Sequence, residues 1–293
     1  MKDKIIYALG FFDGVHLGHQ ALLENCRQLA RQTGCLAGAV TFDTHPLAIM
    51  LGEAPALINQ NTDRDGLLRQ FSMQTVVCMP FDARLRTMPW TDFLLMLIEN
   101  HGAAGFVCGD DFRFGYRGEG NAERLAKFCL RQGLSCRVVP EQTLDGVRIS
   151  STYIRRLIEA GDVEKAKRFL GHPHILSGRV MPGRQLGRTI GVPTANIPIP
   201  KGVVVPKQGV YACTCRVDGT EYKAVTNIGS RPTVGGHQLR SESWLLDFSG
   251  DLYGRTLTLE FHQFLRPERK FNSLEALQAQ IQKDTAQTRE IFF

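Results

Sequence analysis

The sequence predicts two modules: an α/β module with a parallel, doubly wound sheet, followed by a small antiparallel β-barrel with a C-terminal helix. Strand-like and helical patterns alternate in the first half, which is typical of a parallel sheet. Alternating strands with turn signals dominate the second half. A chain of 293 residues is also long enough for two domains.

The first half contains short apolar runs typical of buried strands, and between them segments with helical spacing that end near glycine. The strand-like runs are IIYALGFF (5–12), LAGAVTF (36–42), TVVCMPF (75–81), AGFVCG (104–109) and SCRVVP (135–140). The helical segments are ALLENCRQLARQTG (21–34), WTDFLLMLIENHG (90–102) and NAERLAKFCLRQG (121–133). Ligands of such sheets bind at the carboxyl ends of the strands, so candidate site residues are expected there.

The second half changes pattern after LGHPHI (170–175). Two segments, GVYACTCRVDGTEYKAVTNIG (209–229) and SESWLLDFSGDLYGRTLTLEFHQF (241–264), alternate in polarity, and each predicts an antiparallel hairpin. From Ser273, a good N-cap, an amphipathic helix is expected to run to the end of the chain. The change of pattern predicts domains at 1–172 and 173–293.

Composition excludes several classes of protein. No apolar run approaches the roughly 18 residues of a membrane span, so no membrane partner is expected. The eight cysteines form no C-x-x-C pair and most lie in apolar stretches, which favours reduced thiols in a cytoplasmic protein over a disulfide framework or a metal site.

The net charge of +6 comes mainly from the second half, where 15 Lys and Arg face 10 Asp and Glu after residue 175. Between Ser177 and Gln208 the chain has basic residues and no acidic one. This stretch suits a polyanionic small molecule as well as a nucleic acid. Because this stretch lacks the interleaved aromatics of a single-strand binder, we expect small-molecule substrates and no nucleic acid. A monomer or weak homo-oligomer is also expected.

GFFDGVHLGH (10–19) follows the first strand and enters the first helix. His16 and His19 lie three residues apart beside the positive end of that helix, and with free backbone N–H groups they predict a phosphate cradle. Capping or packing is the structural alternative, and a metal site is weaker because a third ligand is missing. The H-x-G-H motif resembles the nucleotidylyltransferase superfamily, whose members transfer a nucleotide monophosphate to an acceptor phosphate and release pyrophosphate.

ISSTYIRRL (149–157) is the expected counterpart of this motif. Ser150, Ser151 and Thr152 are good N-cap residues, and Arg155 returns to the same helix face one turn later. In the family that it resembles, a Ser-Thr-x-x-Arg motif of this kind binds the ATP phosphates. An ordinary capped surface helix is the alternative.

LGRTIGVPTANIPIP (186–200) carries a basic residue and a P-T-A-N tetrad in the second half. The Thr194 hydroxyl and the Asn196 carbonyl are hard oxygen ligands suited to Mg²⁺, which bridges substrate phosphates. A proline-bracketed turn, with Thr and Asn satisfying backbone groups, is the alternative.

These motifs, together with GDDFRFG, QGVYAC, TNIGSRPT, SESWLLDFSGDLYG and LRPERKF, occur in the order found in prokaryotic bifunctional riboflavin kinase/FMN adenylyltransferases, also called FAD synthetases. The resemblance runs from about Ile5 to the last helix. It implies a Rossmann-like nucleotidylyltransferase module and a riboflavin kinase barrel. It also implies two reactions that use ATP with Mg²⁺: riboflavin is phosphorylated to FMN, and AMP is transferred to FMN to give FAD and pyrophosphate.

In the first module the resemblance makes His16 and His19 catalytic groups that stabilise the ATP phosphates. The ATP-binding residues that it implies are Gly10, Phe11, Asp13, Gly14, His16, His19, Ser151, Thr152 and Arg155. Asp111 and Phe114 follow a predicted strand, where a polar and an aromatic group suit an isoalloxazine ring. A loop that merely packs its phenylalanines is the alternative.

In the barrel the resemblance makes Thr194 and Asn196 the magnesium ligands and Glu242 the base that takes the proton from the riboflavin 5′-hydroxyl. The ATP-binding residues implied there are Gly183, Arg188, Gly191, Thr194 and Asn196. The alternative for Glu242 is an outward strand residue, because Asp247, Asp251 and Glu260 occupy similar strands. Thr44 and Val192 depart from the family pattern without removing a chemical group.

Overall fold

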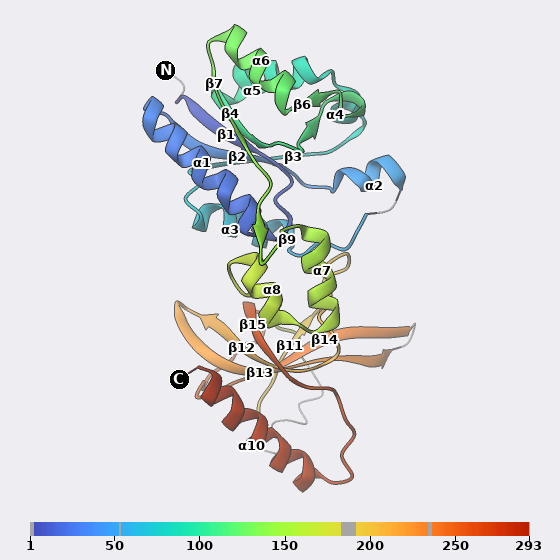
Figure 1. Cartoon of the computed structure of the whole chain (residues 1–293). Coiled ribbons are helices and arrows are strands. Elements are labelled where there is room, and N and C mark those ends of the chain that lie inside the picture. The colour runs from blue at the N-terminus through green and yellow to red at the C-terminus, as the bar shows by residue number, and fades with distance from the viewer. Residues whose placement is uncertain (1–2, 53, 183–191, 234–235, 293) are drawn as a thin grey trace. The chain divides into compact units, whose positions relative to one another are not determined.

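The structure is a computed structural model that describes residues 3–52, 54–182, 192–233 and 236–292 (Figure 1). It divides the chain into two compact units, residues 1–56 with 61–151, and residues 57–60 with 152–293. Gly183, Arg188 and Gly191 lie outside the described residues. The domain boundary predicted at 172/173 stays a prediction about which part of the chain folds and works alone.

The first unit is built on a five-stranded sheet of order β3-β2-β1-β4-β7 in which all neighbouring strands are parallel. The strands are β1 Ile5–Leu9, β2 Leu36–Phe42, β3 Thr75–Met79, β4 Ala103–Gly109 and β7 Ser135–Val139. The buried residues of β1 form a continuous apolar run, as expected where both faces of a parallel sheet are covered. The predicted parallel α/β module is confirmed.

Helices cover both faces of this sheet. The larger ones are α1 Leu17–Thr33, α3 Asn61–Gln70, α5 Trp90–His101 and α6 Ala122–Gln132, and the shorter elements are η1 Asp13–Val15, α2 Pro46–Leu51, α4 Ala83–Thr87, β5 Arg113–Phe114, η2 Tyr116–Gly118, β6 Gly120–Asn121, β8 Thr143–Leu144 and β9 Val147–Arg148. Ile5, Tyr7 and Leu9 of β1 share a core with α5 and α6, whereas the intervening Ile6 and Ala8 are buried outside that core, and the thiol of Cys26 in α1 donates to the carbonyl of Ile6. Since successive strand residues point to opposite faces, α1 lies on the face opposite α5 and α6 (Figure 1).

The second unit is a nearly closed antiparallel barrel with strand order β10-β15-β12-β13-β14-β11. Its strands are β10 His174–Arg179, β11 Ala195–Pro198, β12 Gly209–Val217, β13 Thr220–Thr233, β14 Gly236–Leu245 and β15 Thr256–Arg266. A bridge between Met181 and Asn196 joins the two ends of the sheet. Helices α7 Ser151–Ala160 and α8 Val163–Leu170 precede the barrel, and α10 Leu274–Ile291 follows it.

The first predicted hairpin is confirmed, and the second is wrong. β12 and β13 pair around Asp218 and Gly219, whose positive φ angles of 50° and 82° suit a two-residue hairpin turn. In contrast, β14 pairs with β13 and β11, and β15 pairs with β12 and β10. The ten residues between β14 and β15 place Phe248 and Tyr253 against the barrel core, so this connection is long enough to reach a distant strand.

The C-terminal helix begins where the sequence predicts. The Ser273 hydroxyl accepts a hydrogen bond from the Ala276 N–H at 3.2 Å, which caps α10. Arg266 at the end of β15 forms an ion pair with Asp284 of α10 at 2.8 Å, and Asp284 is buried. This pair anchors α10 to the outer face of the barrel. Among the described residues, no helix is both long and apolar enough to cross a membrane.

Candidate functional sites

The first candidate site lies where the strand order of the parallel sheet reverses. β1 has β2 on one side and β4 on the other, so the carboxyl ends of β1 and β4 border the crevice where ligands of such sheets bind. A pocket of about 230 Å³ opens at this point. Its lining includes Gly10, Phe11, His16 and His19 from the first motif and Asp111 from the segment after β4.

The two histidines of the motif lie face to face. His16 is the N-cap of α1, and its Nδ1 accepts a hydrogen bond from the backbone N–H of His19 at 3.3 Å. Their rings are stacked, with centroids 3.6 Å apart and planes 12° apart. Gly18 permits this arrangement, because a Cβ there would lie 3.2 Å from the His16 ring. The stack presents two imidazoles at the start of a helix, where backbone N–H groups are also available to an anion.

The electrostatic environment keeps His19 neutral. Burial lowers the pKa of His19 well below its ordinary value of 6.5, and the charges of His16 and Arg64 lower it further. Neutral imidazole has one N–H donor and one acceptor, so His19 can donate a hydrogen bond without carrying a full charge. Its Nδ1 is buried and has no hydrogen-bond partner among the described residues.

Arg64 packs against the loop that follows β1. The side chain is 1% exposed, and its guanidinium carbon lies 4.4 Å from the centre of the Phe11 ring. Its Nη2 donates to the carbonyl of Phe42 and to Oδ1 of Asn61. Burial lowers the pKa of Arg64, while the neighbouring Cys78, Asp13 and Asp43 raise it. Arg64 thus holds the loop after β1 against the end of β2. The sequence analysis assigned no role to Arg64.

The turn between β1 and α1 has an unusual backbone. Phe12, Gly14 and Val15 have positive φ angles of 59°, 80° and 39°. Asp13 is buried at this turn, and its carbonyl accepts a hydrogen bond from the Ser151 hydroxyl at 2.9 Å. The structure therefore joins Ser151 of the second motif to the first motif. Thr152 and Arg155 belong to the other unit, so their predicted action together with the histidines stays a prediction.

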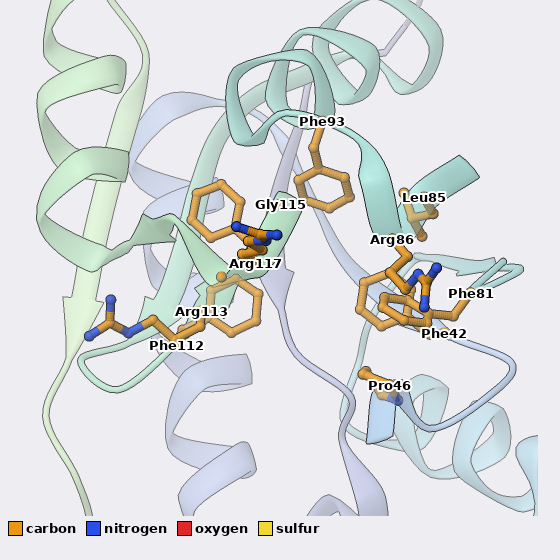
Figure 2. Close-up of a pocket in the computed structure, with 12 residues that line it drawn as sticks. Phe42, Pro46, Phe81, Leu85, Arg86, Phe93, Phe112, Arg113, Gly115 and Arg117 are labelled. Carbon is orange, nitrogen blue, oxygen red and sulfur yellow. The ribbon is translucent and has the colours of Figure 1, made fainter. Parts of the chain in front are cut away.

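An aromatic pocket of about 410 Å³ lies in the same unit. Figure 2 shows the side chains of Phe42, Phe81 and Phe93 around it, with the guanidinium groups of Arg86 and Arg117. Phe112 and Phe114 complete the lining and are stacked, with centroids 5.5 Å apart. A flat aromatic ligand with an anionic group suits this lining.

The structure places the two predicted flavin residues in different pockets. Phe114 is buried in the aromatic pocket, whereas Asp111 lines the histidine pocket and forms an ion pair with Arg148 at 2.7 Å. Phe112, which lies in the same predicted loop but was not assigned to the flavin, lines both pockets. The two pockets therefore share this residue.

The second candidate site lies between the outer face of the barrel and α10. Strand pairing places Val210, Asn227, Glu242 and Asn196 in one row across β12, β13, β14 and β11. Directly paired residues of an antiparallel sheet point to the same face, with Cβ atoms about 5 Å apart. A pocket of about 360 Å³ covers part of this row, and Thr194, Asn227 and Glu242 line it.

The lining of the barrel pocket combines apolar and polar side chains. Val225 and Trp244 of the strands and Leu277 and Ile281 of α10 supply apolar surface. Glu242 and Glu268 contribute carboxylates to the same lining, and Val192 also lies there. The pocket can therefore hold an apolar ring and place a polar chain beside a carboxylate.

Thr194 and Asn196 fit the requirements of a hard cation. Nδ2 of Asn196 donates to the Thr194 carbonyl at 3.4 Å, which leaves Oδ1 as the free acceptor of this amide. Oδ1 is buried and has no hydrogen-bond partner among the described residues. An orphaned carbonyl oxygen beside a threonine is a suitable ligand for Mg²⁺. Within the described part of the chain, no three His, Cys, Asp or Glu side chains gather as a metal site. Mg²⁺ usually keeps several waters and binds substrate phosphates, and both would add to these two ligands.

The other carboxylates considered from sequence lie away from this pocket. Asp247 forms an ion pair with Arg289 at 2.7 Å, and Asp251 accepts a hydrogen bond from the Tyr253 N–H. Glu260 accepts from the Thr214 hydroxyl at 3.3 Å. None of these three lines the pocket, whereas Glu242 and Glu268 do. The LRPERKF motif contains Glu268, but its sequence gave no chemical reason to single out that carboxylate.

Two family models match the two halves of the chain: FAD synthetase over residues 1–153 and riboflavin kinase over residues 170–292. Together they define a class of proteins that join an FAD synthetase module to a riboflavin kinase module.

Comparisons over the whole chain agree with the two family models. The chain is 39% identical to a bifunctional riboflavin kinase/FMN adenylyltransferase of Pseudomonas fluorescens, over 98% of this chain and 92% of that protein. It is 37% identical to the protein of the same name from Escherichia coli strain K12, over 99% and 94%. The chain belongs to the family of bifunctional riboflavin kinase/FMN adenylyltransferases. A crystal structure described as a macrolide-efflux protein from Streptococcus pneumoniae superimposes with a TM-score of 0.87 at 29% identity, over 98% of this chain and 94% of that one.

Proposed function

We propose that this chain makes FAD from riboflavin in two steps, both of which use ATP. The barrel unit phosphorylates riboflavin to FMN, and the α/β unit transfers AMP from ATP to FMN and releases pyrophosphate. The observation that carries this proposal is the presence of two chemically different pockets, one in each unit, that hold the motifs of the two family models. Small molecules in the cytoplasm are the expected partners.

In adenylyl transfer, a phosphate oxygen of FMN attacks the α-phosphorus of ATP. The bond between that phosphorus and the oxygen bridging to the β-phosphate breaks, and pyrophosphate leaves with the electron pair. His16, His19 and the N-terminus of α1 would stabilise the charge that develops on the phosphates. Gly10, Phe11, Asp13 and Gly14 would shape the loop. Because the acceptor is already an anion, this step needs no base.

The second motif would hold the same polyphosphate. The Ser151 hydroxyl donates a hydrogen bond to the Asp13 carbonyl, so the first residue of α7 lies next to the first motif. Thr152 and Arg155 follow on this helix, and we assign them to the ATP phosphates on the strength of the Ser-Thr-x-x-Arg motif.

The flavin ring of FMN would occupy the aromatic pocket. Its phenylalanines offer stacking surfaces, and because Phe112 lines both pockets the ring would lie next to the histidine pocket. Arg86, Arg113 and Arg117 add positive charge to this lining, which suits the FMN phosphate. We assign the ring to Phe114 and Phe112, and Asp111 to the rim of the histidine pocket.

In the kinase step, Glu242 would accept the proton of the riboflavin 5′-hydroxyl while the 5′-oxygen attacks the γ-phosphorus of ATP. The bond from that phosphorus to the β-phosphate oxygen breaks, and ADP leaves. Phosphoryl transfer depends mostly on positioning and charge neutralisation, with a base that orients the attacking group. Thr194 and Asn196 would hold Mg²⁺, which neutralises phosphate charge when bound. Gly183, Arg188 and Gly191 would complete the ATP site.

The products of the purified chain test this proposal. Riboflavin, ATP and Mg²⁺ are supplied in one reaction and FMN, ATP and Mg²⁺ in another, and the flavins are separated by chromatography. We expect FMN and FAD from the first mixture and FAD from the second. Formation of FMN alone would mean that the α/β unit is inactive, and formation of FAD from FMN alone would mean that the barrel is. A chain that forms neither product would not be the enzyme proposed here.

A further inference from the structure

The barrel pocket contains a second carboxylate with no assigned task. Glu242 lies on β14, whereas Glu268 lies on the segment between β15 and α10, and both line the pocket. Glu268 is exposed, so its carboxylate can contact a ligand that enters the barrel pocket. Two features of β13 fix the position of this side chain.

The first feature is a hydrogen bond from Asn227. Its Nδ2 donates to Oε1 of Glu268 at 2.8 Å. A carboxylate accepts hydrogen bonds and donates none, so the amide nitrogen of Asn227 must face Glu268. The second feature is Gly229, where a Cβ would overlap Oε1 of Glu268. β13 thus provides both a donor that orients the carboxylate and the space that it needs.

The strand register sets the distance between Glu268 and the proposed base. Asn227 pairs directly with Glu242, which puts their Cβ atoms about 5 Å apart on one face. Glu268 is hydrogen-bonded to Asn227, so its carboxylate lies beside the residue that pairs with Glu242. A riboflavin molecule whose 5′-hydroxyl contacts Glu242 would place its secondary ribityl hydroxyls on the side of Asn227 and Glu268. Val225 and Trp244 continue the same face and suit the ring beyond.

We propose that Glu268, oriented by Asn227, accepts hydrogen bonds from the secondary hydroxyls of the ribityl chain and so makes the kinase site specific for flavins with a polyol side chain. This inference rests on the proposed riboflavin kinase activity of the barrel. Oε1 is held by Asn227, and among the described residues Oε2 has no donor, so Oε2 is available to the substrate. Hydrogen bonds to a charged group strengthen binding enough to matter for selection between substrates.

The test compares two substrates in the full-length protein. Riboflavin has secondary hydroxyls, and 10-(5-hydroxypentyl)-7,8-dimethylisoalloxazine has the same ring and terminal hydroxyl without them. The measured quantity is kcat/KM for phosphorylation of each. We expect wild type to prefer riboflavin and Glu268→Ala to lower kcat/KM for riboflavin by about 10- to 100-fold. The value for the hydroxypentyl flavin stays unchanged, so the preference disappears.

Three further variants test the role of Glu268 more specifically. Glu268→Gln keeps an acceptor oxygen and recovers part of the preference, whereas Asn227→Ala releases the carboxylate and reduces it. Glu221→Ala removes a carboxylate of β13 that lies outside the pocket, and it leaves both values unchanged. In a Trp90→Phe background, the emission of Trp244, which lines the pocket, reports whether each variant keeps its fold.

Equal losses for both flavins in Glu268→Ala would overturn the proposal, because Glu268 would then act on the shared ring or on phosphoryl transfer. Unchanged riboflavin kinetics would overturn it as well, and so would a wild-type enzyme with no preference. A wild-type chain that phosphorylates neither flavin would instead remove the kinase function on which the proposal rests.

Discussion

His16 and His19 are proposed to act in one reaction and not in the other. Their stacked rings lie in the α/β unit, and the proposed kinase groups lie in the barrel. We therefore expect His16→Ala or His19→Ala to lower FAD formation from FMN by about 10²-fold or more, because a donor to the developing phosphate charge is lost. The measurement is the initial rate of each step in the same protein.

FMN formation provides the control, because it should stay near the wild-type rate. If a folded His19→Ala protein lost both activities equally, the two sites would not be separate.

Glu242 gives the reciprocal prediction. Glu242→Gln keeps the shape of the side chain but cannot take a proton, so kinase turnover is expected to fall by roughly 10² to 10⁴ while riboflavin still binds. Adenylation of supplied FMN stays unchanged. Kinase turnover near the wild-type level would show that Glu242 is not the base, and Glu268 would be the next carboxylate to test, because Asp247 and Asp251 lie outside the pocket.

His174 predicts a pH dependence of stability. Its side chain is fully buried in β10, neither ring nitrogen has a hydrogen-bond partner among the described residues, and burial lowers its pKa to about 3. The folded protein therefore keeps His174 neutral, while the unfolded chain takes up a proton below about pH 6.5. Stability is expected to fall as the pH drops from about 6.5 toward 3.

Urea unfolding at several pH values checks this. The chain has two tryptophans, so replacing Trp90 with Phe leaves Trp244 as the reporter of the barrel. In this background, His174→Leu should flatten the loss of stability on acidification, whereas His101→Asn in the α/β unit should not. An unchanged acid response in His174→Leu would assign the effect to other groups.

At the scale of elements, α10 depends on one buried ion pair. Arg266 makes hydrogen bonds to both oxygens of Asp284, whose side chain is 3% exposed, and Gln280 also donates to it. Asp284→Ala leaves Arg266 with an unpaired charge, which typically costs about 3–5 kcal/mol. We expect α10 to loosen and the KM for riboflavin to rise, because Leu277 and Ile281 form one pocket wall.

The matched control replaces both partners. An Arg266→Met, Asp284→Leu double variant removes the pair without leaving a buried charge, so it should recover much of the stability. Urea unfolding followed through Trp244 measures both proteins. A double variant as unstable as Asp284→Ala would mean that the loss comes from the hydrogen bonds of the pair itself and not from an unpaired buried charge.

The elements also show what a sequence can and cannot predict. Strand patterns located β2, β7 and β12 well, because buried apolar runs and alternation are local signals. Alternation does not name the partner of a strand, and for this reason the predicted hairpin of β14 with β15 was wrong. Helix α1 begins at Leu17, earlier than the apolar periodicity indicated, because His16 acts as its N-cap.

The candidate sites show the same limit of prediction from sequence. The motifs drew attention to the histidine loop and to Thr194, Asn196 and Glu242. The structure brings these last three to one pocket or its neighbouring row, and their roles stay predictions. Glu268 and Phe112 were not assigned roles, because their importance depends on contacts across the fold: a hydrogen bond from β13 in one case and two adjoining pockets in the other.

For the whole molecule, the main question is how much chain the kinase needs. The sequence places its start near Pro173, whereas Val163 of α8 is buried in the barrel core and Phe169 and Leu170 are fully buried. We expect fragments 152–293 and 173–293 both to phosphorylate riboflavin, with the shorter one less stable by several kcal/mol because it loses these side chains. Kinase assays and thermal unfolding compare the two.

Both fragments lack residues 57–60, so this segment does not affect the comparison. In the full chain Leu57 exchanges backbone hydrogen bonds with Gly202 and Val204, and both fragments lose them equally. If the two fragments unfolded at the same temperature, α8 would not belong to the stability unit of the barrel. If fragment 152–293 folded and bound riboflavin but made no FMN, the kinase would need residues of the α/β unit.

The shared position of Phe112 has a consequence for the energetics of adenylyl transfer. Phe112 lines two pockets, so a ligand in either pocket would limit the conformations that Phe112 can adopt toward the other. If nucleotide and flavin occupy these pockets as proposed, their affinities would be coupled, and thermodynamic reciprocity would require each substrate to change the affinity for the other by the same factor. Whichever substrate arrived first, the free energy of the ternary complex would be the same, and a larger or smaller side chain at position 112 would alter that common factor.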